Sequence, residues 1–328
     1  MDFDKLFSSF KDIKVAVVGD VMLDTYWWGK VDRISPEAPV PIVAVSKREE
    51  RIGGAGNVAL NIQALGASVS VISVIGNDAE AGLLKGLLND NHINTDHLVS
   101  SAGRITTNKI RIIGRNQQMM RLDAEITHPL SATDEQDLLS AFEDYIKKEQ
   151  PSIVILEDYN KGVLTTTAIE KIISLCRSNN ILTAVDPKRK NFFTYRHVDI
   201  FKPNLHEAKE GLNIISDEVT DESLKNIHQA LHDKLRQNIS LITLSEKGVF
   251  YQHNDEHLVI PTHIRSIADV SGAGDTVIAV ASVVYAATKD VRLMAEMANI
   301  AGGLVCEEVG TVAIDKSRLL EECKHLLN

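Results

Sequence analysis

Short apolar runs rich in Val and Ile recur along the chain, and several of them end at Asp or Gly. Such runs are typical of strands that are buried on both faces of a parallel sheet. They cover residues 14–20, 68–76, 152–158, 181–186, 198–204 and 240–248. Segments with a helical pattern separate them, at residues 78–91, 133–149, 165–179, 205–211 and 221–237. This alternation predicts an α/β fold with a mostly parallel central sheet flanked by helices, in which ligands bind at the carboxyl ends of the strands.

Two segments break the alternation. Residues 25–48 contain three prolines and no helical pattern, and residues 104–125 alternate like antiparallel strands. We expect both segments to leave the main sheet and form a small β-sheet lid. An apolar face on this lid would pair with a second copy of the chain, which predicts a homodimer through the lid. No interdomain linker is visible, so we expect one domain over residues 1–328.

The charge balance excludes several kinds of partner. The chain has 35 Lys and Arg against 45 Asp and Glu, a formal net charge of −10. This balance argues against general binding to nucleic acid or to a membrane surface. The longest apolar run, residues 276–288, is shorter than the roughly 20 residues that span a bilayer. The polar start shows no signal peptide and the three cysteines are far apart, so we expect a cytoplasmic protein.

The segment DVSGAGDTVIA (residues 269–279) places glycines and a carboxylate directly before a helix-like apolar run. A helix N-terminus favours an anion, and glycines allow a close approach of the backbone. The amides of Gly272, Ala273 and Gly274 would then form an anion hole for a phosphoryl group, and Asp275 would accept a hydroxyl proton. A glycine turn in which Asp275 only caps the helix explains the same spacing.

A second glycine-rich segment, GGAGNVALNIQALG, covers residues 53–66. Gly54, Gly56 and Ala59 match the dinucleotide-binding fingerprint, which keeps a nicotinamide-dependent oxidoreductase as an alternative. The charged residues before the match speak against it, since the fingerprint follows a buried strand. Close approach of the backbone to a polar ligand, with the amide of Asn57 as a donor, explains the segment better. Tight packing of a helix on the sheet needs no ligand at all.

Two further segments carry carboxylates where strands end. Asp20 and Asp24, in GDVMLD (19–24), could accept paired hydrogen bonds from the vicinal hydroxyls of a sugar, or could be a cap and a solvated turn. Asn204 and Glu207, in KPNLHEAKE (202–210), could hold a hydrated Mg²⁺. The same pair is also the ordinary pattern of a capped helix start.

Basic residues gather in two places of this acidic chain. One group lies in the predicted lid and the other follows a predicted strand. They are Lys109, Arg111, Arg115 and Arg121, then Lys188, Arg189 and Lys190. Both groups could meet a phosphorylated substrate, although a solvated face explains any one of them.

Taken together, these motifs resemble the ribokinase family of sugar kinases, the PfkB carbohydrate kinases. The two glycine-rich segments look like the two signatures of the family, about 200 residues apart and in the same order. The Asn204–Glu207 motif and the segment EEVGTVAI (307–314) also match in order. The resemblance covers nearly the whole chain and implies a ribokinase-like fold and an ATP- and Mg²⁺-dependent sugar kinase.

The resemblance also implies roles for individual residues. Asp275 looks like the catalytic base, beside the anion hole. The residues expected to bind the substrate are Asp20, Asp24, Gly53, Gly54 and Asn57, with Arg111, Lys161 and Lys188 as candidates for a substrate phosphate. The residues expected at the nucleotide are Asn204, Glu207, Ser245, Lys247, Gly248 and Asn299, with Glu207 reaching Mg²⁺ indirectly. Asp269, with residues 309–311, is a candidate for a K⁺ site.

Stretches outside the general signatures resemble the members of the family that act on heptose 7-phosphate. They are residues 19–43, 118–125, 157–164 and 186–210. This implies phosphorylation of the C1 hydroxyl of D-glycero-β-D-manno-heptose 7-phosphate, in the synthesis of ADP-heptose for lipopolysaccharide. No H-x-G-H motif of an adenylyltransferase occurs, so a stand-alone kinase or a kinase half is expected, with a separate phosphatase and adenylyltransferase.

Two alternatives remain besides the oxidoreductase. One is a kinase of the same family for another sugar, such as fructose 1-phosphate, a 6-phosphate sugar or ribose. The other is a catalytically idle sugar sensor on a kinase scaffold. The intact Asp275 and its preceding glycines speak against a sensor, which has no need of a base.

Overall fold

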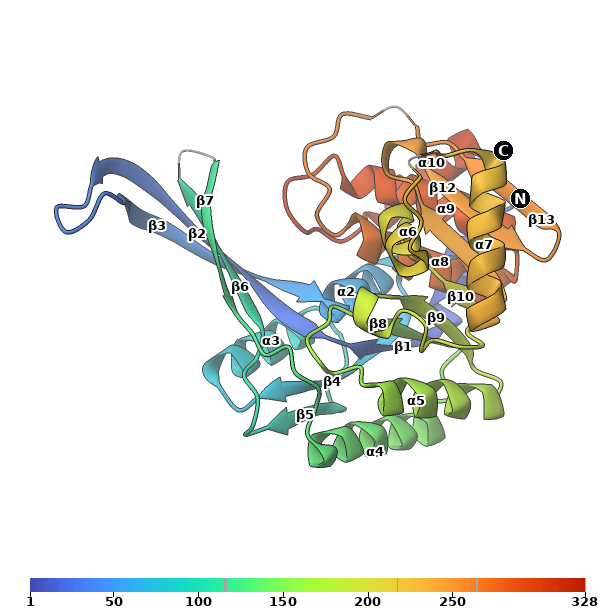
Figure 1. Cartoon of the computed structure of the whole chain (residues 1–328), viewed down its shortest axis with the longest axis horizontal. Coiled ribbons are helices and arrows are strands. Elements are labelled where there is room, and N and C mark those ends of the chain that lie inside the picture. Colours follow the sequence, from blue (N-terminus) through green and yellow to red (C-terminus); the bar gives the residue numbers. More distant parts are fainter. Residues whose placement is uncertain (115–116, 217, 264, 328) are drawn as a thin grey trace.

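A computed structural model of the chain describes residues 1–114, 117–216, 218–263 and 265–327. A central sheet runs through the body of the molecule, with helices on both faces (Figure 1). Within the described residues its strand order is β13-β12-β11-β10-β9-β8-β1-β4-β5. The strands are β1 Lys14–Gly19, β4 Ser68–Gly76, β5 Leu98–Ser101, β8 Ile153–Glu157, β9 Leu182–Asp186, β10 Ile200–Phe201, β11 Ile239–Thr243, β12 Val249–His253 and β13 Glu256–Ile260.

The strands from β5 to β11 pair in parallel, and β12 and β13 add an antiparallel hairpin at one edge. Each of the six predicted apolar runs forms one of the parallel strands. The expectation of a mostly parallel sheet is therefore confirmed. The hairpin and β5 were not expected, because short strands at a sheet edge have a weak apolar pattern.

Alternate residues of the central strand β1 supply two separate cores. Val15 and Val17 belong to a core with the helices α2 (Ala55–Leu65), α8 (Ala273–Thr288) and α9 (Val291–Val305). Ala16 and Val18 belong to a core with α4 (Ala132–Glu149), α5 (Thr166–Ser178) and α7 (Asp221–Leu235). This is the burial of a strand covered by helices on both faces. The helices are α1 Phe3–Ser9, α2 Ala55–Leu65, α3 Ala79–Asp90, α4 Ala132–Glu149, α5 Thr166–Ser178, α6 Leu205–Leu212, α7 Asp221–Leu235, α8 Ala273–Thr288, α9 Val291–Val305 and α10 Lys316–Leu326, with short 3-10 helices η1 Phe10–Asp12, η2 Arg189–Asn191 and η3 Ser245–Lys247.

A second, smaller sheet projects from the body as a long arm (Figure 1). Its order is β3-β2-β6-β7, from β2 Val21–Ile34, β3 Pro41–Gly54, β6 Asn108–Gly114 and β7 Gln117–Ala124. β2 pairs with β3 in antiparallel register and with β6 in parallel register. β2 and β3 are longer than expected from residues 25–48, because the prolines at 36, 39 and 41 fall in or beside the connection and leave both strands free to extend toward the body. Arg115, one of the basic residues singled out in the sequence, lies outside the described residues.

The small sheet has one polar and one apolar face. Cross-strand neighbours share a face, and the register aligns Asp24 with Lys109, and Trp27 with Ile112 and Met120. Tyr26 and Arg111 therefore lie on the polar face together with Asp24 and Lys109, whereas Ile110 and Leu122 join the apolar face. None of the described helices combines the length and the apolar character needed to cross a bilayer.

Candidate active site

The polypeptide turns sharply at Gly272 to start α8, and this turn defines the site. Gly272 is the N-cap residue, with φ 78° and ψ 0°, in the left-handed region that favours glycine. A Cβ at this position would lie 2.9 Å from the side-chain nitrogen Nδ2 of Asn57, so the turn packs closely on the first residues of α2. The N–H of Ala273 donates to Val270 O at 3.3 Å within the turn. Gly274 faces the side chains of Asp186 and Lys202, each 3.7 Å from a Cβ built there.

Asp275 lies in the first turn of α8, and its carboxylate is almost fully buried. It accepts hydrogen bonds from Asn57 Nδ2 at 2.7 Å and from the Tyr159 hydroxyl at 2.6 Å. Burial raises the pKa of Asp275 to about 6, although these two hydrogen bonds act in the opposite direction. The side chain is thus oriented by two donors and has the pKa of a base that works near neutral pH.

Tyr159 is a site residue that the sequence did not single out. Two cations lie over its ring, with Lys109 Nζ at 5.6 Å and Lys188 Nζ at 5.7 Å from the centroid. Burial, and then the charge of Asp275, raise the pKa of the Tyr159 hydroxyl well above its usual value. The hydroxyl therefore stays protonated and donates to Asp275. Nothing in the local pattern distinguishes this tyrosine from an ordinary loop residue.

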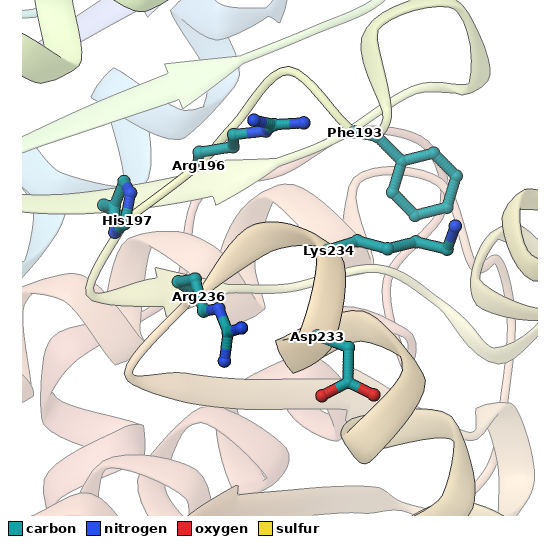
Figure 2. A pocket seen from close by; sticks show the side chains of 6 residues that line it. All are labelled: Phe193, Arg196, His197, Asp233, Lys234 and Arg236. Carbon is teal, nitrogen blue, oxygen red and sulfur yellow. The ribbon is translucent and has the colours of Figure 1, made fainter.

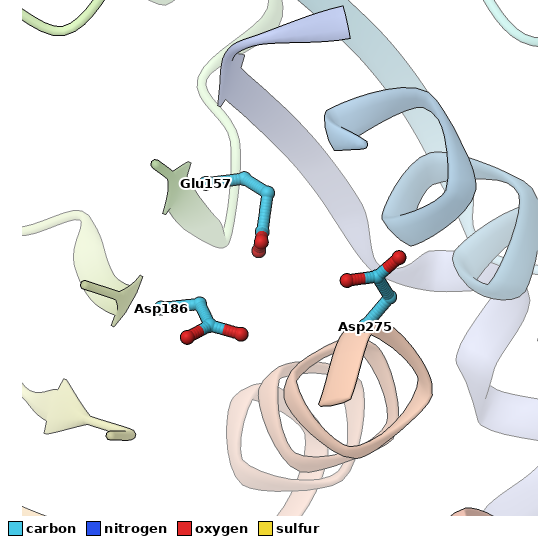
Figure 3. Close-up of side chains that lie close together, drawn as sticks. All are labelled: Glu157, Asp186 and Asp275. Atoms are coloured by element: carbon cyan, nitrogen blue, oxygen red, sulfur yellow. The ribbon is translucent and has the colours of Figure 1, made fainter. Parts of the chain in front are cut away.

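Three buried carboxylates meet in front of α8: Glu157, Asp186 and Asp275, with ligand atoms within 4.8 Å of one another (Figure 3). Glu157 and Asp186 are the last residues of β8 and β9 and pair in the parallel register, which brings them together at the carboxyl edge. Among the described side chains, no hydrogen-bond partner reaches either oxygen of Glu157 or Oδ1 of Asp186. Burial, reinforced by the two neighbouring carboxylates, raises the pKa of Glu157 well above its usual value. The cluster therefore favours a cation or a proton.

Two lysines border this cluster. The buried Lys202 places Nζ 2.8 Å from Asp186 Oδ2, and Lys188 places Nζ 4.0 Å from Asp186 Oδ1. Lys188 also forms an ion pair with Glu207, and Asp186 and then Glu207 raise its pKa despite its burial. Lys188 therefore stays charged and links the cluster to the start of α6.

Asn204 and Glu207 form a capping box at the start of α6. Asn204 Oδ1 accepts from the Glu207 N–H at 2.8 Å, and Glu207 Oε2 accepts from the Asn204 N–H at 2.9 Å. The capped helix start, which explains this motif without a ligand, is thus present in the structure. It leaves room for an indirect contact with Mg²⁺ only, because Glu207 Oε1 is held by Lys188.

The two aspartates near the first strand have different environments. Asp20 is buried, and its oxygens accept from the N–H groups of Tyr159 at 2.8 Å, Lys161 at 3.0 Å and Val163 at 3.1 Å. Asp20 therefore fixes the loop that carries Tyr159. Asp24 forms an ion pair with Arg111. A Cβ on Gly53 would lie 2.3 Å from Asp24 Oδ2 and would displace that carboxylate. A Cβ on Gly54, with φ 59°, would lie 2.3 Å from Asp20 O, so only glycine fits there.

Of the cations proposed for a substrate phosphate, Arg111, Lys161 and Lys188 all have carboxylate partners. Arg111 pairs with Asp24, Lys188 with Glu207, and Lys161 with Glu125 at 2.7 Å. Lys109 differs, since no carboxylate of the described chain lies within ion-pair distance of its Nζ. Burial lowers the pKa of Lys109, and the nearby Lys161 acts in the same direction.

The residues expected at the nucleotide gather around the end of β13. Asn299 Nδ2 donates to Pro261 O at 2.9 Å. Gly248, with φ 97°, packs so closely that a Cβ would lie 2.0 Å from Ile260 O. Ser245 and Lys247 form η3 directly before it. An isolated bridge between Asn204 and Thr243 connects this group to the start of α6.

Asp269 lies in the loop before the turn of α8. Its Oδ1 accepts from the N–H and hydroxyl of Ser271, at 3.0 and 2.9 Å, and its Oδ2 accepts from the Gly310 N–H at 2.9 Å. Burial disfavours the charged form of Asp269 and acts to raise its pKa, but these hydrogen bonds outweigh burial and lower the pKa.

A separate hollow of about 440 Å³ lies at the amino ends of the parallel strands, whereas the site lies at their carboxyl ends. Figure 2 shows the side chains that line this hollow. Its residues precede β10 and β11. They are Phe193, Arg196, His197, Asp233, Lys234 and Arg236. None of the predicted site residues lines this hollow.

A family model described as "pfkB family carbohydrate kinase" matches residues 12–317. The chain belongs to the pfkB family of carbohydrate kinases. It is therefore a sugar kinase, and both the predicted fold class and the family resemblance are confirmed. The oxidoreductase alternative is wrong, because the match begins at Gly54, the last residue of β3 in the small sheet, and not after a parallel strand of the central sheet.

Curated relatives of this pfkB kinase carry the name bifunctional protein HldE. That of Aliarcobacter butzleri is 41% identical over 97% of this chain and 66% of its own length. That of Methylobacillus flagellatus is 40% identical over 94% of this chain and 62% of its own length. The chain thus spans less than two thirds of these relatives.

Solved structures of other sugar kinases share the fold at low identity. Phosphofructokinase-2 from Escherichia coli in complex with potassium superposes with a TM-score of 0.81 at 16% identity, over 96% of this chain and 99% of the other. Ribokinase of Arabidopsis thaliana, complexed with ribose and ATP, superposes with a TM-score of 0.72 at 16% identity, over 94% and 99% of the chains.

Proposed function

We propose that this kinase transfers the γ-phosphoryl group of ATP to the C1 hydroxyl of D-glycero-β-D-manno-heptose 7-phosphate, giving the 1,7-bisphosphate. The observation that supports the transfer chemistry is Asp275, a buried carboxylate with a pKa of about 6 at the first turn of α8. The heptose phosphate is supported by the stretches that resemble heptose kinases and by the identity of about 40% to the HldE proteins.

In the proposed reaction, Asp275 accepts the proton of the C1 hydroxyl while the new O–P bond forms and the bond to the leaving ADP breaks. Asn57 and Tyr159 hold the carboxylate in the orientation this transfer needs. The start of α8, at Gly272 and Gly274, supplies a partial positive charge for the transferred phosphoryl group. The small sheet covers the site as a lid and excludes water.

The free carboxylate oxygens fit a divalent cation. Glu157 Oε1 and Oε2 and Asp186 Oδ1 are buried without a hydrogen-bond partner in the described part of the chain, and oxygen donors suit Mg²⁺. We assign them to Mg²⁺, with Glu207 at its periphery. Bound Mg²⁺ neutralises charge on the nucleotide phosphates. Asn204, Ser245, Lys247, Gly248 and Asn299 border the nucleotide.

For the 7-phosphate, we propose Lys109 in place of the three cations first considered. Arg111, Lys161 and Lys188 already neutralise carboxylates. Lys109, in contrast, brings an uncompensated charge onto the polar face of the small sheet beside Tyr159. A phosphate dianion would restore its pKa and offset the cost of its burial. Lys161, whose charge acts on Lys109, would assist.

The remaining proposals concern partners. A homodimer through the apolar face of the small sheet would close the site from outside. The product would need a phosphatase and an adenylyltransferase to reach ADP-heptose. The proposal concerns the sugar-kinase reaction, since the chain matches 66% and 62% of the length of these HldE relatives.

The test is release of ADP from MgATP with heptose 7-phosphate, the unphosphorylated heptose, fructose 6-phosphate, fructose and ribose. We expect turnover with heptose 7-phosphate and weak or no turnover with the others. Asp275→Asn should lose roughly 10²–10⁴-fold in kcat, the usual contribution of a general base. Turnover with another sugar alone would refute the substrate, and an Asp275→Asn enzyme of near-parental rate would refute the mechanism. Binding of the sugar without any ADP release would favour the sugar sensor.

A further inference from the structure

The guanidinium of Arg51 reaches from β3 of the small sheet to the loop that faces the start of α8. Its Nη1 donates to Val309 O and to Thr311 O, at 3.4 Å each. Its Nε donates to Glu49 Oε1 at 2.7 Å, and its carbon lies 4.9 Å from the ring centroid of Tyr26. Three different groups thus hold one cation in a half-buried position.

The loop that Arg51 contacts packs against the turn that begins α8, the proposed phosphate-binding turn. Gly310, between the two carbonyls, donates its N–H to Asp269 Oδ2 at 2.9 Å. On its other side the loop touches the N-cap of α8, since a Cβ on Gly272 would lie 3.1 Å from Thr311 Cγ2. The position of residues 309–311 therefore bears on the position of the turn that begins α8.

The sequence predicted a monovalent cation in this region. The oxygen atoms that would bind it, however, already have other partners. Both oxygens of Asp269 already accept hydrogen bonds from Ser271 and Gly310. The carbonyls of Val309 and Thr311 already accept from Arg51. Each of these four oxygens thus already has a hydrogen-bond partner within the chain.

We propose that Arg51 is a built-in cation that holds residues 309–311 against the start of α8, so that this kinase works without a bound monovalent cation. Arg51 is a positioning residue, because it acts on the phosphate-binding turn through the loop. In β3 it pairs with Asp24 of β2 and precedes Gly53 and Gly54 by two and three residues. The same strand therefore connects the sugar side of the site to the phosphate side. The proposal rests on the proposed kinase reaction but not on the identity of its sugar.

The test compares Arg51→Met, which keeps the length of the side chain but removes its charge, with the parent. Arg48→Met is the matched control, because Arg48 lies on the same strand and stacks on Trp27 at 4.8 Å. kcat and both KM values are measured in chloride salts of potassium, sodium and tetramethylammonium. Melting temperatures are measured in the same salts without substrate.

We expect equal rates of the parent and of Arg48→Met in all three salts. Arg51→Met should lose roughly 10- to 100-fold in kcat, as expected for a misplaced reacting group, with a smaller change in the KM for the sugar. Potassium or millimolar guanidinium should restore part of that rate. Potassium should raise the melting temperature of Arg51→Met and leave that of the parent unchanged.

Three results would overturn the proposal. One is a parent enzyme that loses activity when tetramethylammonium replaces potassium. Another is an Arg51→Met enzyme whose loss no cation restores, which would indicate a packing role only. The third is a loss confined to the KM for the sugar, which would indicate direct contact with substrate. If Arg51→Met does not fold, Arg51→Gln, which also removes the charge, takes its place, and if no sugar is turned over, the melting temperatures still decide.

Discussion

The carboxylate of Asp275 is placed where its charge is costly to the fold and useful to the reaction. Burial raises its pKa from 3.8 to about 6, so the folded chain retains a proton that the unfolded chain releases between these values. Stability from this group is therefore lost as the pH rises from about 4 through 6. Asp275→Asn should accordingly be more stable than the parent at neutral pH, by roughly 2–3 kcal/mol from the size of the shift, and the gain should vanish near pH 4.

The pH dependence of the rate should report the same group. Asp275 must be unprotonated to accept the hydroxyl proton, so kcat/KM should fall as the pH drops below about 6. Tyr159→Phe removes a hydrogen bond that favours the charged carboxylate. We therefore expect its acid limb to move to higher pH, measured by ADP release across the pH range. Tyr251→Phe, at a hydroxyl that bonds Glu256 on the hairpin edge, is the control and should keep the parental profile.

An acid limb that moves to lower pH in Tyr159→Phe, or does not move at all, would contradict the role assigned to this hydroxyl.

At the scale of a single element, the start of α8 depends on a backbone conformation that only glycine adopts at low cost. Gly272→Ala should lower kcat strongly, because a methyl group there meets the amide of Asn57 at 2.9 Å and the φ of 78° is unfavourable for alanine. Stability should also fall, by about 1–2 kcal/mol. Both effects are measured by ADP release and by denaturant unfolding.

Gly86→Ala in α3 is the matched control, since a Cβ there meets nothing within 4 Å. It should be neutral in rate and more stable by about 0.5–1 kcal/mol. A Gly272→Ala enzyme with the rate of Gly86→Ala would show that the turn tolerates a side chain and is not the phosphate-binding element.

The predictability of these elements follows from the kind of signal each one carries. The inner parallel strands and the helices α3 to α7 have clear apolar patterns, and the two glycine segments mark the starts of α2 and α8, so the sequence predicts these elements. The short strands β5, β12 and β13 and the helix α9 were not among the expected segments. The cluster of Glu157, Asp186 and Asp275 joins three elements far apart in the chain. Its members become neighbours only through the parallel register of β8 and β9, which no local pattern reveals. Tyr159 and Arg51 escaped notice for the same reason.

At the scale of the whole molecule, the small sheet presents an apolar face that the body does not cover. Met120 is 56% and Leu122 42% exposed, and the register places Trp27, Ile110 and Ile112 on the same face. Apolar side chains gathered on a projecting sheet indicate an interface. The polar face, with Asp24 and Lys109, is turned toward the active site.

We expect a homodimer that forms through this face. The parent should sediment as a dimer at micromolar concentration, and Met120→Lys with Leu122→Lys should shift it to a monomer by placing charges in the contact. Leu83→Lys in α3, at a leucine that is 51% exposed, is the control and should remain a dimer. A parent that sediments as a monomer at all concentrations would refute the dimer.

The parallel pairing of β2 with β6 has a consequence for the order in which the molecule is made. It joins Leu23 to Asn108 and Gly29 to Gly114, whereas β2 with β3 and β6 with β7 are local hairpins. During synthesis the first hairpin must wait, with one edge of β2 unpaired, until two helices and two strands of the central sheet have followed it. Long-range parallel pairing is slow to form, and unpaired strand edges are prone to aggregate. The small sheet, the proposed lid, is thus the part of the nascent chain most dependent on prompt folding of what lies between its two halves.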